Sequence, residues 1–94
     1  MSVHDRVVKV VAVWGHLPTP PNDSDLLQAI WAKSHESFPF QPDAAQQLII
    51  DLQNEFKDPP VVIVRLLPSD LNPLGNIKTV GDLATAVGQM PGSN

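Results

Sequence analysis

Residues 77–83 read Ile-Lys-Thr-Val-Gly-Asp-Leu, and this stretch contains a well-defined helix start. Thr79 and Asp82 form a T-x-x-D capping box, in which each side chain accepts a hydrogen bond from the backbone amide of the other residue. The residues that would share one apolar face of the helix are Val80, Leu83, Ala84 and Val87. The sequence therefore predicts a helix that begins at Thr79 and buries that face.

Two further segments have the periodicity of amphipathic helices. The first covers 42–57, where Pro42 suits the first helical position and Asp43 favours the positive end of the helix dipole. Its apolar stripe consists of Ala45, Leu48, Ile49, Leu52 and Phe56. The second covers about 23–33, with the side-chain oxygens of Asn22, Asp23 and Ser24 as candidate caps. Prolines on both sides separate these helices from the rest of the chain.

Two apolar segments are compatible with either helix or strand. At the N-terminus Val3, Val7 and Trp14 share a helical spacing with Val10 or Val11, but 6–14 is rich in β-branched residues. The run 61–67 is typical of a buried strand. We expect a mainly α-helical domain, a small bundle of four helices. The alternative is an α+β domain with strands near 6–14 and 61–67.

Composition limits the size, the surroundings and the partners of the protein. A chain of 94 residues predicts one domain, here 1–90, followed by a frayed tail at 91–94. There is no cysteine, no signal-peptide pattern and no apolar run long enough to span a bilayer, which predicts a cytoplasmic protein without a membrane partner. The formal net charge is -4, and the six Lys and Arg residues are scattered singly, so nucleic acid is not an expected partner.

No set of residues predicts catalysis or metal binding. His4, His16 and His35 lack the i, i+4 spacing of a helical metal site. No nucleophile motif, glycine-rich phosphate loop or close carboxylate pair is present. We expect neither catalytic nor metal-ligating residues. Trp14 and Trp31 fall on apolar stripes and are predicted to be core residues.

Three segments together resemble the acyl carrier proteins of fatty-acid and polyketide synthesis. They are Leu48 to Phe56, the tetrapeptide Leu67-Pro68-Ser69-Asp70, and Ile77 to Val87 with its Thr-Val-Gly-Asp sequence. In that family the last segment follows a short third helix and opens the final helix. The resemblance covers about half the chain, and it implies a small, acidic, mostly four-helix bundle.

The chain departs from that family at its defining residue. The resemblance places a phosphopantetheine-bearing serine at the start of the second helix, where this chain has Gln41-Pro42-Asp43-Ala44. We therefore expect no cofactor. Ser34 and Ser37 lie upstream and are the candidate attachment sites for 4'-phosphopantetheine if the chain is a carrier after all. Relative to the family, 61–67 is an insertion and 18–31 is longer and more apolar.

The resemblance also implies a docking surface, because carriers bind partner enzymes through the acidic face of that helix. The residues expected to form it here are Asp43, Gln47, Asp51, Glu55 and Asp58. An ordinary solvated helix face would have the same pattern.

The function we expect is a non-enzymatic carrier-like interaction module that docks on a protein such as a biosynthetic enzyme, or encloses an apolar ligand between its helices. The alternatives are a genuine acyl or peptidyl carrier using an unusual serine, and a small α+β adaptor or structural subunit.

Overall fold

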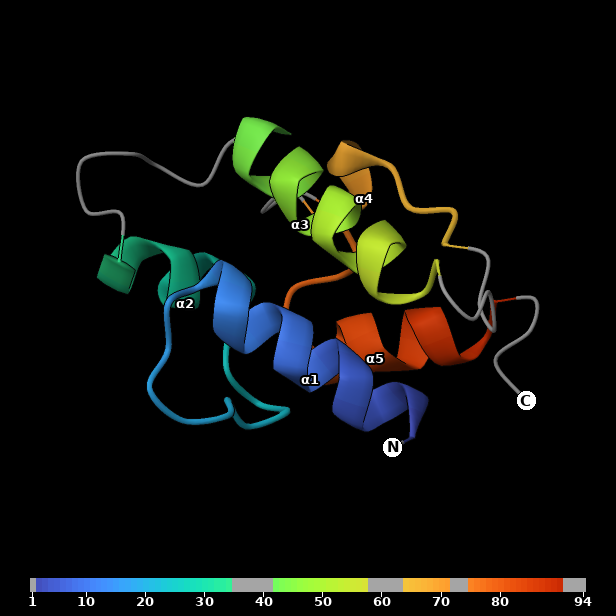
Figure 1. Cartoon of the computed structure of the whole chain (residues 1–94). Coiled ribbons are helices and arrows are strands. Elements are labelled where there is room, and N and C mark those ends of the chain that lie inside the picture. The colour runs from blue at the N-terminus through green and yellow to red at the C-terminus, as the bar shows by residue number, and fades with distance from the viewer. Residues whose placement is uncertain (1, 35–41, 58–63, 72–74, 91–94) are drawn as a thin grey trace.

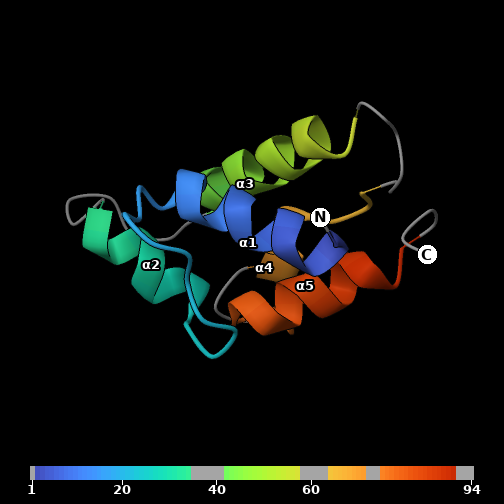
Figure 2. The same cartoon turned by 60° about the horizontal axis from the view of Figure 1, so that its bottom comes forward.

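The protein is a small, mainly helical bundle in a computed structural model that describes residues 2–34, 42–57, 64–71 and 75–90. The helices are α1 (Val3–Trp14), α2 (Leu27–Ser34), α3 (Pro42–Glu55), α4 (Pro68–Leu71) and α5 (Val80–Gly88). Figures 1 and 2 show α1 between α3 and α5, with α4 against α3 and α2 at one end. The predicted mainly α fold is confirmed.

The N-terminal segment is a helix, so the strand alternative for 6–14 is wrong. Its start is capped by Ser2, whose hydroxyl accepts a hydrogen bond from the Asp5 amide at 3.1 Å. The buried residues of α1 are Val7, Val10, Val11 and Trp14, at the spacing that the sequence predicts. Burial of this stripe between two neighbouring helices outweighs the strand preference of its valines. In the second candidate strand, 64–67 has no regular secondary structure, and 61–63 lies outside the described residues.

The chain reverses sharply after α1. The Leu17 amide donates to the Ala12 carbonyl at 2.8 Å and the His16 amide donates to the Val13 carbonyl at 3.2 Å, which is the bonding pattern of a Schellman motif. His16 has a φ of 54°, the left-handed conformation that this motif requires. The motif directs residues 17–20 back alongside α1.

The second helix begins later than the sequence predicts. It starts at Leu27 rather than near Asp23, because the backbone of 23–27 bonds to the start of α5. The Gly81 amide donates to the Asp23 carbonyl at 2.8 Å, the Val80 amide donates to the Asp25 carbonyl at 2.9 Å, and the Leu27 amide donates to the Lys78 carbonyl at 2.9 Å. The predicted cap is also different, since the Asp25 carboxylate accepts from the Asn22 amide and closes a turn instead.

The other helices agree closely with their sequence signals. Helix α3 starts at Pro42 and ends two residues before the expected Lys57, and its predicted apolar stripe is buried. The Thr79–Asp82 capping box is present in both directions, and the predicted inner face of α5 is buried. Helix α4 begins earlier than the resemblance implies, because Pro68–Leu71 covers most of the tetrapeptide 67–70 that the resemblance assigns to the loop before a short helix.

Within the described residues, one hydrophobic core joins the five helices. Trp14 is buried and Trp31 is half-buried, and their rings stack with centroids 4.9 Å apart. The Trp14 indole also donates a hydrogen bond of 3.1 Å to the Ala44 carbonyl at the start of α3. None of the described helices has the length and apolar character needed to cross a membrane. The predicted tail at 91–94 lies outside the described residues.

Candidate functional site

The predicted docking residues on α3 form a line along the outside of the bundle. Asp43 and Gln47 are exposed, and Asp51 is half-buried. Because four residues advance slightly more than one helical turn, these three side chains follow one another on the same side of α3. The Gln47 amide nitrogen donates to an Asp51 carboxylate oxygen at 3.0 Å, which orients that carboxylate. We call Asp43, Gln47 and Asp51 the acidic face.

Glu55, the next residue in the line, is engaged inside the molecule. Its carboxylate lies 3.1 Å from Lys9 Nζ and 3.5 Å from Arg6 Nε, both on α1. The Arg6 guanidinium also bonds to the Glu55 carbonyl and lies 4.4 Å from the centre of the Phe56 ring. Glu55 thus joins α1 to the C-terminal end of α3, and two cations already compensate its charge. Its expected role in binding a partner stays a prediction.

The other residues predicted from the sequence contribute less to the geometry. Asp58 and Ser37 lie outside the described residues. Ser34 is the last residue of α2, at the negative end of the helix dipole. A phosphodiester is favoured at the opposite, positive end of a helix, so the position of Ser34 does not resemble a carrier attachment site.

Most other described carboxylates have a structural role. Asp5 and Asp23 both bond to His4, at 3.4 and 2.7 Å. Asp70 Oδ2 accepts from the Leu67 amide at 2.9 Å, and Asp82 caps α5. The backbone amides of Lys78 and Thr79 lower the pKa of Asp82 below its ordinary value.

Asp43 and Asp51 differ from these carboxylates in the part of the chain that the structure describes. Neither lies within ion-pair distance of a described cation. Asp51 bonds only along its own helix, to Gln47, and Asp43 acts on the structure through the dipole of α3. Their negative charge is therefore available at the surface.

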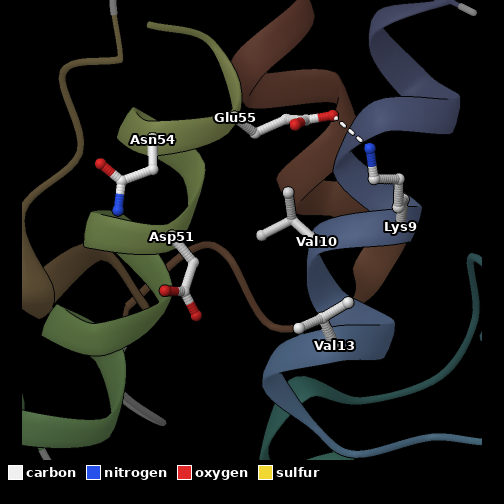
Figure 3. Close-up of a pocket in the computed structure, with 6 residues that line it drawn as sticks. All are labelled: Lys9, Val10, Val13, Asp51, Asn54 and Glu55. Atoms are coloured by element: carbon white, nitrogen blue, oxygen red, sulfur yellow. Dashed lines mark hydrogen bonds and ion pairs between the residues drawn. The ribbon is translucent and has the colours of Figure 1, made fainter.

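A groove that the sequence did not reveal runs beside the acidic face. It lies between α1 and α3, has a volume of about 280 Å³, and is lined by Lys9, Val10, Val13, Asp51, Asn54 and Glu55. Figure 3 shows Val10 and Val13 pointing from α1 towards the gap, with Asp51 on the opposite side and the Lys9–Glu55 ion pair at one end. The sequence contains one indication of this groove. Val13 lies off the predicted apolar stripe of α1, so a helical assignment leaves this valine outside the core.

No group of described side chains comes together in a way that could hold a metal ion. Comparison of the chain with protein-family models, with curated proteins and with solved structures gave no match, so the residues and their arrangement carry the proposals that follow.

Proposed function

We propose that this protein is a non-enzymatic, cytoplasmic interaction module of the acyl-carrier type, which carries no phosphopantetheine and docks a protein partner through the acidic face of α3. The observation that supports this most is that Asp43 and Asp51, which neither pair with a described cation nor bond to a described residue outside α3, lie on the same outer side of that helix. Because no described cation neutralises them, these carboxylates are available for a partner.

The charge of this face favours a partner with a basic surface. The molecule has a net charge of -4, and Arg6 and Lys9, which belong to the neighbouring helix α1, are bound to Glu55. A polyanion such as nucleic acid would be repelled, whereas Lys and Arg side chains on a protein would be attracted and oriented.

Docking agrees with the interior of the bundle better than enclosure of an apolar ligand. Among the described residues the side chains that fill the core are apolar, and the two grooves beside α1 are open to solvent rather than enclosed. The likeness to carriers is supported by the capped start of α5 at the Thr-Val-Gly-Asp sequence.

Site-specific cross-linking in the native cell tests the proposed face. A photoreactive residue at Gln47 should give a defined protein adduct, and one at Gln28, exposed on α2, should not. The adduct should be lost in the double variant Asp43→Asn, Asp51→Asn. It should persist in Asp23→Asn, which removes a negative charge that lies against α1 and α5 instead. Equal adducts from Gln47 and Gln28 would contradict the proposal.

Binding strength gives a quantitative check once a partner is identified. Asp51→Asn keeps an oxygen that can accept from Gln47, so the fold should be unaffected while affinity falls about three- to tenfold at low salt. The difference should fade near 1 M salt, where charges are screened beyond about 3 Å.

The intact mass of the native protein tests the absence of a cofactor: a phosphopantetheine arm on Ser34 or Ser37 would show a genuine carrier instead.

A further inference from the structure

Val13 is an apolar side chain that α1 leaves in solvent. It is 69% exposed, whereas Val10 and Trp14 on the neighbouring positions are buried. On one side of Val13 lies the groove between α1 and α3 described above, here called the first groove. A single exposed valine is ordinary on a protein surface, so its significance depends on the surface around it.

A second groove lies on the other side of Val13. It separates α1 from residues 17–20 and has a volume of about 470 Å³. Its lining is Asp5, Val8, Lys9, Ala12, Val13, Leu17, Pro18, Thr19 and Pro20. The rings of Pro18 and Pro20 fix the φ angles of these two residues, which lowers the entropy that this wall loses when a partner binds. Val13 therefore stands as a ridge between two grooves.

Each groove also carries a carboxylate at its edge. Asp51 lines the first groove and has no cation beside it among the described residues, and Asp5 lines the second. Lys9 borders both grooves, but its ammonium is bound to Glu55. The unmatched charge around the ridge is negative, so a complementary partner is apolar at its centre and basic at its edges.

We propose that Val13 and the two grooves bind a basic amphipathic helix of the protein partner. Two apolar side chains one turn apart on that helix enter the grooves on either side of Val13, as the side chains of one helix fit around those of another. A Lys or Arg on the same helix pairs with Asp51. This inference rests on the proposed function, because Asp51 belongs to both the acidic face and the first groove.

A synthetic helix of about 16 residues provides the probe, long enough to be partly helical in water. It carries two leucines four residues apart, flanked by lysines, on an alanine background. One control peptide has the same composition, but its two leucines lie on opposite faces of the helix. The other control peptide has glutamates in place of the lysines. Titration into isotope-labelled protein should give saturable shifts at the amides of Val13 and Asp51 with the first peptide, and at least about tenfold weaker binding with each control.

Two matched variants locate the binding. Val13→Gln should weaken binding of the first peptide about tenfold, since it removes an exposed apolar contact and leaves the core unchanged. Leu67→Gln makes the same kind of change at a residue that is 63% exposed before α4, and it should bind like the original chain. Shifts centred away from α1, or equal weakening by both variants, would overturn the inference.

The design separates this inference from the function on which it rests. If Val13→Gln leaves the native cross-link at Gln47 intact while Asp43→Asn, Asp51→Asn abolishes it, the acidic face is right and the helix-binding ridge is wrong. If neither change affects the cross-link, the acidic face itself is wrong.

Discussion

His4 links the start of α1 to the loop before α2. Its Nε2 lies 2.7 Å from Asp23 Oδ1 and its Nδ1 lies 3.4 Å from Asp5 Oδ1. These hydrogen bonds, with Asp23 the larger contributor, raise the pKa of His4 above the ordinary value of 6.5. Protonation therefore favours the folded state. The stabilisation is fully present below the pKa of the unfolded chain and is lost as the pH rises through the higher pKa of the folded protein.

Replacing His4 should accordingly have a pH-dependent cost. We expect His4→Gln to lower the free energy of unfolding more at about pH 5.5 than at about pH 8.5, where the imidazole of the original chain is neutral. Urea denaturation at the two pH values measures this difference. In an NMR titration, Asp23→Asn should bring the pKa of His4 down. A difference between His4→Gln and the original chain that is the same at both pH values would disprove the assignment.

The capping box at Thr79 stabilises the start of helix α5, and substitutions at two threonines can measure this effect. Thr79 accepts from the Asp82 amide at 3.0 Å and Asp82 accepts from the Thr79 amide at 3.2 Å. Thr79→Ala should lower the free energy of unfolding by about 1 kcal/mol. Thr85→Ala, at an exposed position within the same helix, should raise it by a few tenths of a kcal/mol because alanine is the better helix former. Chemical denaturation of both variants is the measurement, and equal effects would exclude a capping role.

The helices that could be predicted from sequence are those with local signals. The Thr79–Asp82 box and the stripe that ends at Phe56 use only neighbouring residues, and both were found where expected. The start of α2 was misplaced because Asp23 and Asp25 bond to a distant segment, which local patterns do not reveal. The N-terminal valines are ambiguous in the sequence because their assignment depends on the two neighbouring helices that cover them.

The candidate site was predictable only in part, for the same reason. The spacing of Asp43, Gln47 and Asp51 follows from the helix alone. The ion pairs of Glu55 and the grooves beside Val13 depend on how α1 packs against α3 and on the turn at His16. The sequence contains those residues, but their proximity is a property of the folded protein.

The helices of the bundle differ in how many neighbours surround them. Helix α1 lies between α3 and α5, whereas α2 lies at one end (Figure 2). Helix α2 reaches the core through Leu27, Ile30 and the Trp31 ring stacked on Trp14. A short helix with few neighbours opens more readily than one surrounded by others.

Hydrogen exchange in the native state should show this order. We expect the amides of α2 to exchange through openings of lower free energy than the amides of α1 and α3. Trp31→Ala should increase this difference in opening free energy between α2 and the other two helices, because it weakens the contact with Trp14. Ile50→Ala, on the exposed side of α3, should leave the difference unchanged. Uniform exchange free energies across all the helices would mean that α2 belongs to the same cooperative unit.

The backbone bonds between 23–27 and 78–81 have a consequence for the lifetime of the folded protein. They join segments far apart in the chain, so closing them requires a large loss of chain entropy, and they are expected to form late in folding. Interactions that form after the transition state affect mainly the rate of unfolding. At Gly81 an added methyl group would lie 3.1 Å from the Asp23 carbonyl oxygen. We therefore expect strain at that point, as in Gly81→Ala, to shorten the lifetime of the native state and to leave the refolding rate nearly unchanged.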